Sequence, residues 1–164
     1  MAFANTSGPI GAQPIADTST TQKHPLGTIV RADDPTLGGG EFIYLKGVAS
    51  TVVGSIVNYD DGFQTALDTS AVAGPSRPLA VAMSANVAAQ YGWYQISGLA
   101  VATKANTVSF ADGAGLGAAS GLAVAVATGT VIQGAVVRTV ASAKSDVTTV
   151  AIAINRPHDP SDVS

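Results

Sequence analysis

The chain has no cysteine, so disulfide bridges and thiolate chemistry take no part in its fold or its function. Charged residues are scarce as well: they make up 12% of the 164 residues, about half of the share that is usual for globular proteins. The net charge is −3, and the eight basic residues are scattered along the chain. This charge pattern argues against nucleic-acid binding.

A long hydrophobic segment is also missing. The N-terminus, MAFANTSGPIGAQP, has neither a basic region nor a continuous apolar core, so it is unlike a secretory signal peptide. The most apolar stretch, residues 121–137, is too short for a comfortable membrane span and is interrupted by three glycines, two threonines and Gln133. We therefore expect this stretch to form two β-strands and a turn, and we expect no membrane partner.

Small apolar side chains are abundant. Apolar residues make up 46% of the chain, chiefly alanine and valine, whereas aromatic residues make up only 5%. Each small side chain buries little area, so an isolated monomer gains less from its core than a leucine- and phenylalanine-rich chain would. A surface with few charges also disfavours a solitary soluble existence. We therefore expect the protein to dock against partner proteins.

Alternating apolar patterns predict β-strands along most of the chain. The central stretch, residues 79–104, holds two alternating runs and the single tryptophan, Trp93. Residues 41–46 alternate in the same way, and Asp61-Gly62 is the residue pair of a tight hairpin. Further strands are expected at 28–32, 48–60, 63–67, 107–110, 122–126, 130–140 and 147–155. The regular spacing predicts an all-β fold, a compact β-barrel or sandwich of about 8–10 short strands with an extended N-terminal arm and at most one short helix, at residues 84–90.

Residues 1–27 are predicted to form that extended N-terminal arm, ahead of a β domain at 28–157 and a C-terminal tail at 158–164. Prolines spread through the arm oppose a helix and favour extended backbone. Isolated apolar side chains in the arm are candidates to anchor it in pockets of another chain: Phe3, Ile10, Ile15 and Leu26. The alternative to a binding arm, which stays open, is a disordered terminus.

No residue pattern indicates catalysis. The two histidines, His24 and His158, lack neighbours that would position them in a catalytic triad or a zinc site. The acidic residues gather in turns, where aspartate is favoured for backbone reasons. The glycine-rich residues 33–40 lack the ending of a phosphate loop, and residues 113–118 lack the helix and acid of a dinucleotide site. We therefore expect no enzyme, no cofactor, no metal and no small-molecule substrate.

The aromatic residues around Trp93 are candidates for a sugar-binding or partner-binding site. Strand alternation points Trp93 and Tyr94 to opposite faces, so the two rings cannot form one flat platform for a sugar. The chain has few other large side chains, and burial of both rings in the core is therefore favoured. The open alternative is that one of them anchors a partner, because aromatic residues are enriched at interface hot spots.

Several segments, taken in order, carry a resemblance to a known family. They are DDPTLGGGEFIYLKG, GSIVNYD, LAVAMS, YGWYQISGLAVA and AIAINRP. In this order the chain resembles the small structural proteins of tailed bacteriophages that decorate or cement the capsid. It is similar in broad design to the lambda-type head decoration proteins and to the phage capsid cement family. The resemblance covers residues 28–157, and the chain is longer than a minimal lambda-type protein.

The resemblance implies a homotrimeric knob on the outer surface of an icosahedral shell, bound to the major capsid protein at local threefold positions. The arm would bridge neighbouring capsid subunits by pairing with a sheet edge, and many weakly bound copies would act together. The expected location is the exterior of the virion capsid, after synthesis in the host bacterial cytoplasm. Two other classes stay open: another virion component, such as a tail-tube, head-fibre or minor coat protein, and a carbohydrate-binding module that uses Trp93 or Tyr94.

Overall fold

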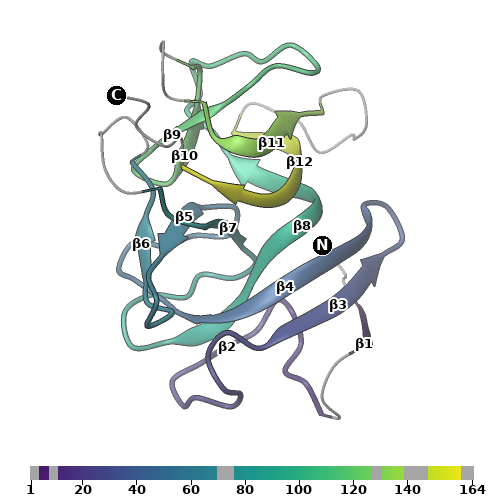
Figure 1. Ribbon diagram of the computed structural model, residues 1–164, viewed down its shortest axis with the longest axis vertical. Helices are drawn as coiled ribbons and strands as arrows, with labels where there is room; N and C mark the ends of the chain where they lie inside the picture. The colour runs from purple at the N-terminus through teal and green to yellow at the C-terminus, as the bar shows by residue number, and fades with distance from the viewer. Residues whose placement is uncertain (1–3, 8–10, 70–75, 127–130, 139–147, 160–164) are drawn as a thin grey trace.

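The computed structural model describes residues 4–7, 11–69, 76–126, 131–138 and 148–159. These residues form an all-β, sandwich-like fold without a helix, as the alternating patterns predict (Figure 1). The strands are β1 (Ala4–Ser7), β2 (Thr18–Ser19), β3 (Ile29–Asp34), β4 (Gly38–Lys46), β5 (Ile56–Tyr59), β6 (Thr65–Leu67), β7 (Leu79–Ala82), β8 (Tyr91–Thr103), β9 (Gly117–Ala119), β10 (Leu122–Val124), β11 (Gln133–Val137) and β12 (Thr149–His158).

Strand β8 is the one around which the others assemble. Tyr91, Tyr94 and Ser97 each pair with β4, and they also pair with β2, β7 and β12 respectively. Because a strand residue has one neighbour on each side, β4 lies along one edge of β8 while β2, β7 and β12 follow one another along the other edge. The main sheet runs β1-β3-β4-β8-β7-β5-β6, with β11 joined through β12, and β9 and β10 form a separate pair.

At the lower left of Figure 1, the sheet curls towards a barrel without closing. A single bridge between Lys46 and Gln64 joins the end of β4 to the start of β6. Three hydrogen bonds support it, from the Lys46 amide to the Phe63 carbonyl at 3.1 Å and from the Gln64 side-chain amide to the carbonyls of Lys46 and Gly47 at 3.3 and 2.9 Å. These contacts cover the edge of β6, which would otherwise be open to pairing with another chain.

A bend in β8 divides the molecule into a lower and an upper part. Gly98 has a φ of 101°, and a Cβ at this position would lie 2.5 Å from the carbonyl oxygen of Gly39. Only glycine adopts this backbone region readily. The buried side-chain amide of Gln95 fills the bend by donating to the carbonyls of Ser97 and Leu99, at 3.1 and 3.2 Å. Beyond the bend, β8 leaves β4 and continues with β12 (Figure 1).

Three apolar clusters pack around β8. The first, which includes Leu116, lies among β5, β7, β12 and the second half of β8. The second contains Tyr44 and Trp93 and is covered by the N-terminal segment. The third contains Tyr94 and lies among β4, β5, β7 and the first half of β8. The first half of β8 therefore has a core on each face, which explains its unbroken burial from Gly92 to Ile96.

Local differences from the sequence prediction follow from packing. Residues 84–90 form tight turns instead of a helical turn, with hydrogen bonds from the Asn86 amide to the Ser84 carbonyl and from the Gln90 amide to the Val87 carbonyl. The strand predicted at 48–60 begins only at Ile56, and residues 107–110 form no strand. The hairpin predicted at Asp61-Gly62 joins β5 to β6 as expected. β-branched composition alone cannot distinguish a loop packed on its neighbours from a paired strand.

Residues 11–27, part of the predicted N-terminal arm, pack against the predicted β domain. Within residues 11–27, β2 pairs with β8, and Ile15 is buried in the cluster that holds Trp93. The segment folds back because the large rings beneath it would otherwise be exposed to water. At the other end, β12 runs to His158, so the sheet includes the first residue of the predicted tail, and residues 160–164 lie outside the described residues.

We predict that Gly98→Ala destabilises the fold by about 3 kcal/mol or more, because the new methyl group meets the backbone of β4 and φ is unfavourable. Gly113→Ala is the matched control: φ is 79°, but no atom lies within 4 Å of its Cβ position. It isolates the cost of φ alone, about 1 kcal/mol. Urea unfolding measures both, and equal losses would contradict the assigned contact at the bend.

Candidate functional site

The structure places Trp93 and Tyr94 inside the molecule, each with no exposed surface. The prediction that both rings are core and face opposite sides is confirmed, because they belong to different apolar clusters. The indole N–H of Trp93 donates to the carbonyl of Gln13 at 2.9 Å. Burial raises the pKa of Tyr94 to about 12, although the side chains of Thr65 and Asn86 act to lower this pKa. Neither ring offers a surface to a sugar or to a partner protein.

Two of the four apolar anchor candidates of the predicted arm pack inside their own chain. Ile15 is buried and Leu26 is half-buried against the same cluster, so both anchor the segment in its own chain. Their predicted role in pockets of another chain stays a prediction, and it would require them to leave this packing. Phe3 and Ile10 lie outside the described residues.

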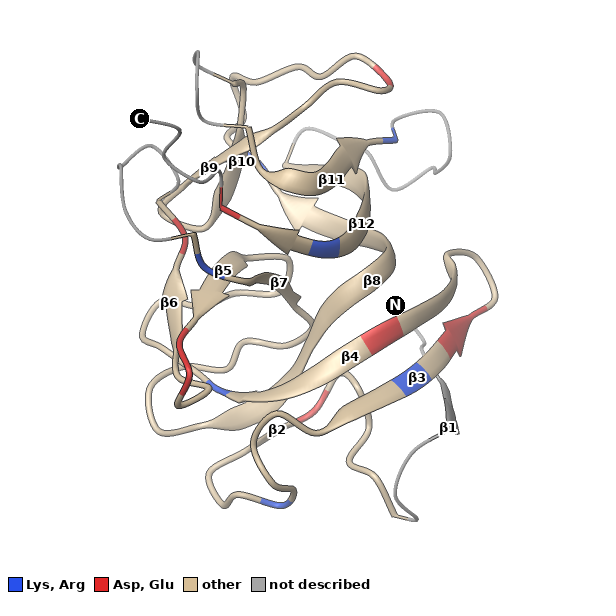
Figure 2. Cartoon of the chain, in the orientation of Figure 1, with Lys and Arg blue, Asp and Glu red and all other residues tan. Residues whose placement is uncertain are grey.

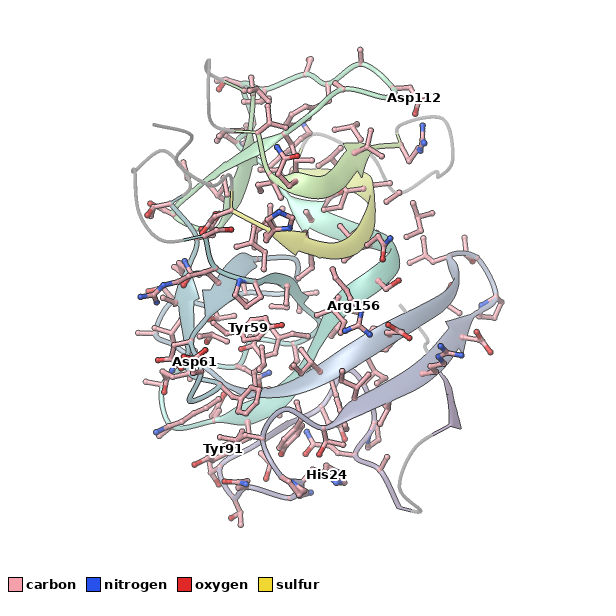
Figure 3. All side chains as sticks on the ribbon, in the orientation of Figure 1. His24, Tyr59, Asp61, Tyr91, Asp112 and Arg156 are labelled. Carbon is pink, nitrogen blue, oxygen red and sulfur yellow. The ribbon has the colours of Figure 1, made fainter. Side chains whose placement is uncertain are left out.

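The two histidines lie in different parts of the structure. His24 accepts a hydrogen bond from the Gln13 amide through Nε2 at 3.1 Å, and its ring centroid lies 5.1 Å from that of Tyr44 and 5.5 Å from that of Trp93 (Figure 3). His24 thus helps to fasten the N-terminal segment to the core. His158 is exposed at the end of β12. Among the described residues, no group of three or more His, Asp or Glu side chains is placed to hold a metal ion.

A surface without charge is formed by two loops, residues 47–55 and 83–90, which we call the uncharged loop pair. Their sequences, GVASTVVGS and MSANVAAQ, contain no charged residue (tan in Figure 2). The loops lie against each other: the Gly47 amide donates to the Gln90 carbonyl at 2.8 Å, and a Cβ on Gly47 would overlap the backbone of Asn86.

Apolar side chains project from this loop pair. Val52 and Val53 are each 49% exposed and Val87 is 39% exposed. They are three of the five large apolar residues that are exposed among the described residues, and the same two loops also expose Ala49, Ala85, Ala88 and Ala89. An exposed apolar patch on a monomer is a typical protein-interaction surface. The sequence predicts a strand over the first loop and a helical turn over the second. The lack of charged residues in both stretches is the signal in the sequence that could have identified this surface.

Charged side chains converge elsewhere, at a hollow between β4 and β12. Glu41 pairs with Arg31 on β3 at 3.0 Å and with Arg156 on β12 at 2.9 Å. The hollow measures about 640 Å³. Arg156 also lines a second hollow of about 350 Å³, together with Tyr59 and Arg77 (Figure 3). Burial raises the pKa of the Tyr59 hydroxyl, while the charge of Arg156 lowers it.

Two carboxyl groups meet beside the second hollow. Asp68 is buried and accepts a hydrogen bond from the side chain of Asn58 at 3.2 Å. Burial, and then the charge and hydrogen bonding of Asp68, raise the pKa of Asp159 to about 6, whereas Arg77 lowers it. The sequence predicts only a turn at Asp159. It does not predict the neighbouring Asp68, because no local pattern indicates that the end of β6 lies beside the end of β12.

We predict that Ile15→Ala lowers stability by about 2–4 kcal/mol, because Ile15 fills the core beneath the N-terminal segment. Deletion of residues 1–27 should be more severe and should shift the fluorescence of Trp93 to longer wavelength, since the deletion exposes the indole. Ile29→Ala is the control, because Ile29 is 42% exposed and should cost less than 1 kcal/mol, roughly. Trp93 emission during urea unfolding reports both effects. A truncated protein with native emission and stability would contradict the assigned packing.

We also predict a pH-dependent gain from Asp159→Asn. The folded pKa of Asp159 lies above its ordinary value of 3.8, so its contribution to stability is present below that value and is lost as pH rises through about 6. The substitution should therefore stabilise the fold at pH 7.5, by about 1 kcal/mol after solvent screening, and bring no gain at about pH 4. Thermal unfolding at the two pH values tests this, with the exposed hairpin acid Asp61→Asn as control. Destabilisation at the higher pH would refute it.

Comparison of the chain with protein-family models, with curated proteins and with solved structures gave no significant match in any of the three. In the described part of the chain, no helix is long and apolar enough to span a membrane. The uncharged loop pair and the arginine-lined hollows are the two candidate interaction surfaces of the described residues.

Proposed function

We propose that the protein is a structural virion protein that decorates a phage capsid by binding the outer surface of the shell. The observation that carries the proposal is the uncharged loop pair, which exposes three valines and carries no charged residue. The resemblance of residues 28–157 to capsid decoration proteins supports the same role. The proposed partner is the major capsid protein, the proposed assembly is a homotrimer, and the role requires no catalysis and no cofactor.

Docking through uncharged loops is favourable for a physical reason. A charged side chain that is buried in an interface without a partner loses its hydration at high cost, whereas valine and alanine gain from the removal of apolar surface from water. A loop pair without charges therefore needs no matching charge on the shell. Weak docking at each position suffices, because many copies on one lattice stabilise the shell together.

The proposal places the shell contact on the loop pair instead of on residues 11–27. If this segment left to bridge capsid subunits, Gln13 would release the indole N–H of Trp93, and Ile15 would leave the core. Such a rearrangement would expose the largest side chain of the protein to water. A strand-adding arm is therefore a poorer candidate for the shell contact than the preformed loops.

The proposal predicts that charges introduced on the loop pair weaken attachment to the shell. Val52→Lys combined with Val87→Lys should lower the affinity for undecorated capsids by about tenfold or more, because an interface would bury unpaired ammonium groups. Val126→Lys, at a valine that is 36% exposed outside the loop pair, controls for the added charge. Co-sedimentation with capsids measures the affinity.

Electron microscopy of labelled particles separates this role from the alternatives. Density on the outer shell supports decoration, whereas density on the tail tube, on a head fibre or at a minor coat position would identify another virion component. Equal capsid affinity of the loop and control variants would refute the docking surface, and absence of binding by the unmodified protein would refute the capsid role. A carbohydrate-binding role through Trp93 or Tyr94 has no support, because both rings are buried.

A further inference from the structure

Two hollows share Arg156 as a lining residue, and we call the two together the arginine track. Arg31 and Arg156 line the larger hollow, and Arg156 and Arg77 line the smaller one. The three arginines come from β3, from the end of β12 and from the loop before β7. Figure 3 shows Arg156 between β12 and β4, and Tyr59 is one of the residues that line the smaller hollow.

The charges along the track are unevenly distributed. In the larger hollow, Asp33 and Glu41 face two arginines. The residues that line the smaller hollow carry Arg77, Arg156 and His158 and include no acid, although Asp159 lies next to Arg77. The smaller hollow is therefore a basic site on a protein whose net charge is −3.

Arg156 is placed to bind a second carboxylate. Its Nη2 donates to Glu41 Oε2 at 2.9 Å, and its side chain is 60% exposed. A guanidinium group has five N–H donors and recognises carboxylates through pairs of them, so one bond to Glu41 leaves donors for a ligand. The bond also holds the side chain over the track, which reduces the entropy lost when a ligand binds.

Apolar walls accompany the basic groups. Pro78, Leu79, Ile96 and Pro157 line the smaller hollow beside the arginines. A ligand that suits both surfaces has carboxylates for the guanidinium groups and a carbon chain for the walls. Glutamate and aspartate side chains on an extended backbone have this combination, and several of them in series can meet arginines that line two hollows with Arg156 in common.

We propose that the arginine track binds an extended acidic segment of a partner protein, with carboxylates paired to Arg77 and Arg156. A nucleic acid, which carries phosphates in place of carboxylates, is the alternative that the test distinguishes. The inference stands apart from the proposed capsid role, since it uses different residues and its test needs no capsid.

The test uses a fluorescent peptide of alternating glutamate and alanine, about nine residues or roughly 30 Å when extended. Fluorescence anisotropy measures its binding to the full-length protein, against a peptide with glutamine in place of glutamate. Arg77→Gln and Arg156→Gln should each weaken binding by about tenfold. Lys23→Gln removes one positive charge at a residue that lines neither hollow, and it should leave binding unchanged.

A substitution that is expected to strengthen binding keeps the test valid even if the arginine variants fold poorly. Asp159→Asn removes a negative charge beside Arg77 and should tighten binding of the glutamate peptide by about twofold or more. Equal binding of the glutamine peptide would overturn the proposal, and so would arginine variants that behave like Lys23→Gln. Tighter binding of a single-stranded oligonucleotide than of the glutamate peptide would also overturn it, in favour of a nucleic-acid site.

Discussion

The backbone hydrogen bonds of β8 are the constraint on which the rest of the structure depends. This strand has a core on both faces along its first half, so each amide and carbonyl there must find a partner within the protein. Strand β4 supplies the partners on one edge, and β2, β7 and β12 supply them in turn on the other. At the bend, where β8 leaves β4, the side-chain amide of Gln95 donates to the backbone carbonyls of Ser97 and Leu99.

The N-terminal segment shows how one buried side chain can determine the position of a whole stretch of chain. Trp93 has an apolar ring system that favours burial and one N–H that requires an acceptor. The carbonyl of Gln13 provides the acceptor, Ile15 covers the ring, and His24 packs against Tyr44 and Trp93. A segment held by these contacts is part of the domain, and this moves the search for partner contacts to the preformed surface.

Two surfaces of different chemistry remain for such contacts. The uncharged loop pair gains from loss of water, and binding through it should depend little on salt. The arginine track attracts opposite charge, and binding through it should weaken as salt screens the guanidinium groups. The two do not share residues, so they can serve two partners or two parts of one partner. Separate substitutions on the two surfaces distinguish these arrangements.

The sequence by itself determined the local features: the all-β class, the strand at residues 41–46, the hairpin at Asp61-Gly62 and the opposite directions of Trp93 and Tyr94. Alternation and turn preference are properties of neighbouring residues, so no tertiary information is needed to recognise them. Tertiary structure alone decided the strand partners of β8, the return of residues 11–27, the loop character of 48–55 and the meeting of Glu41 with Arg156, 115 positions apart. These features depend on which buried surfaces cover one another, and pairing between distant segments leaves no local signal in the chain.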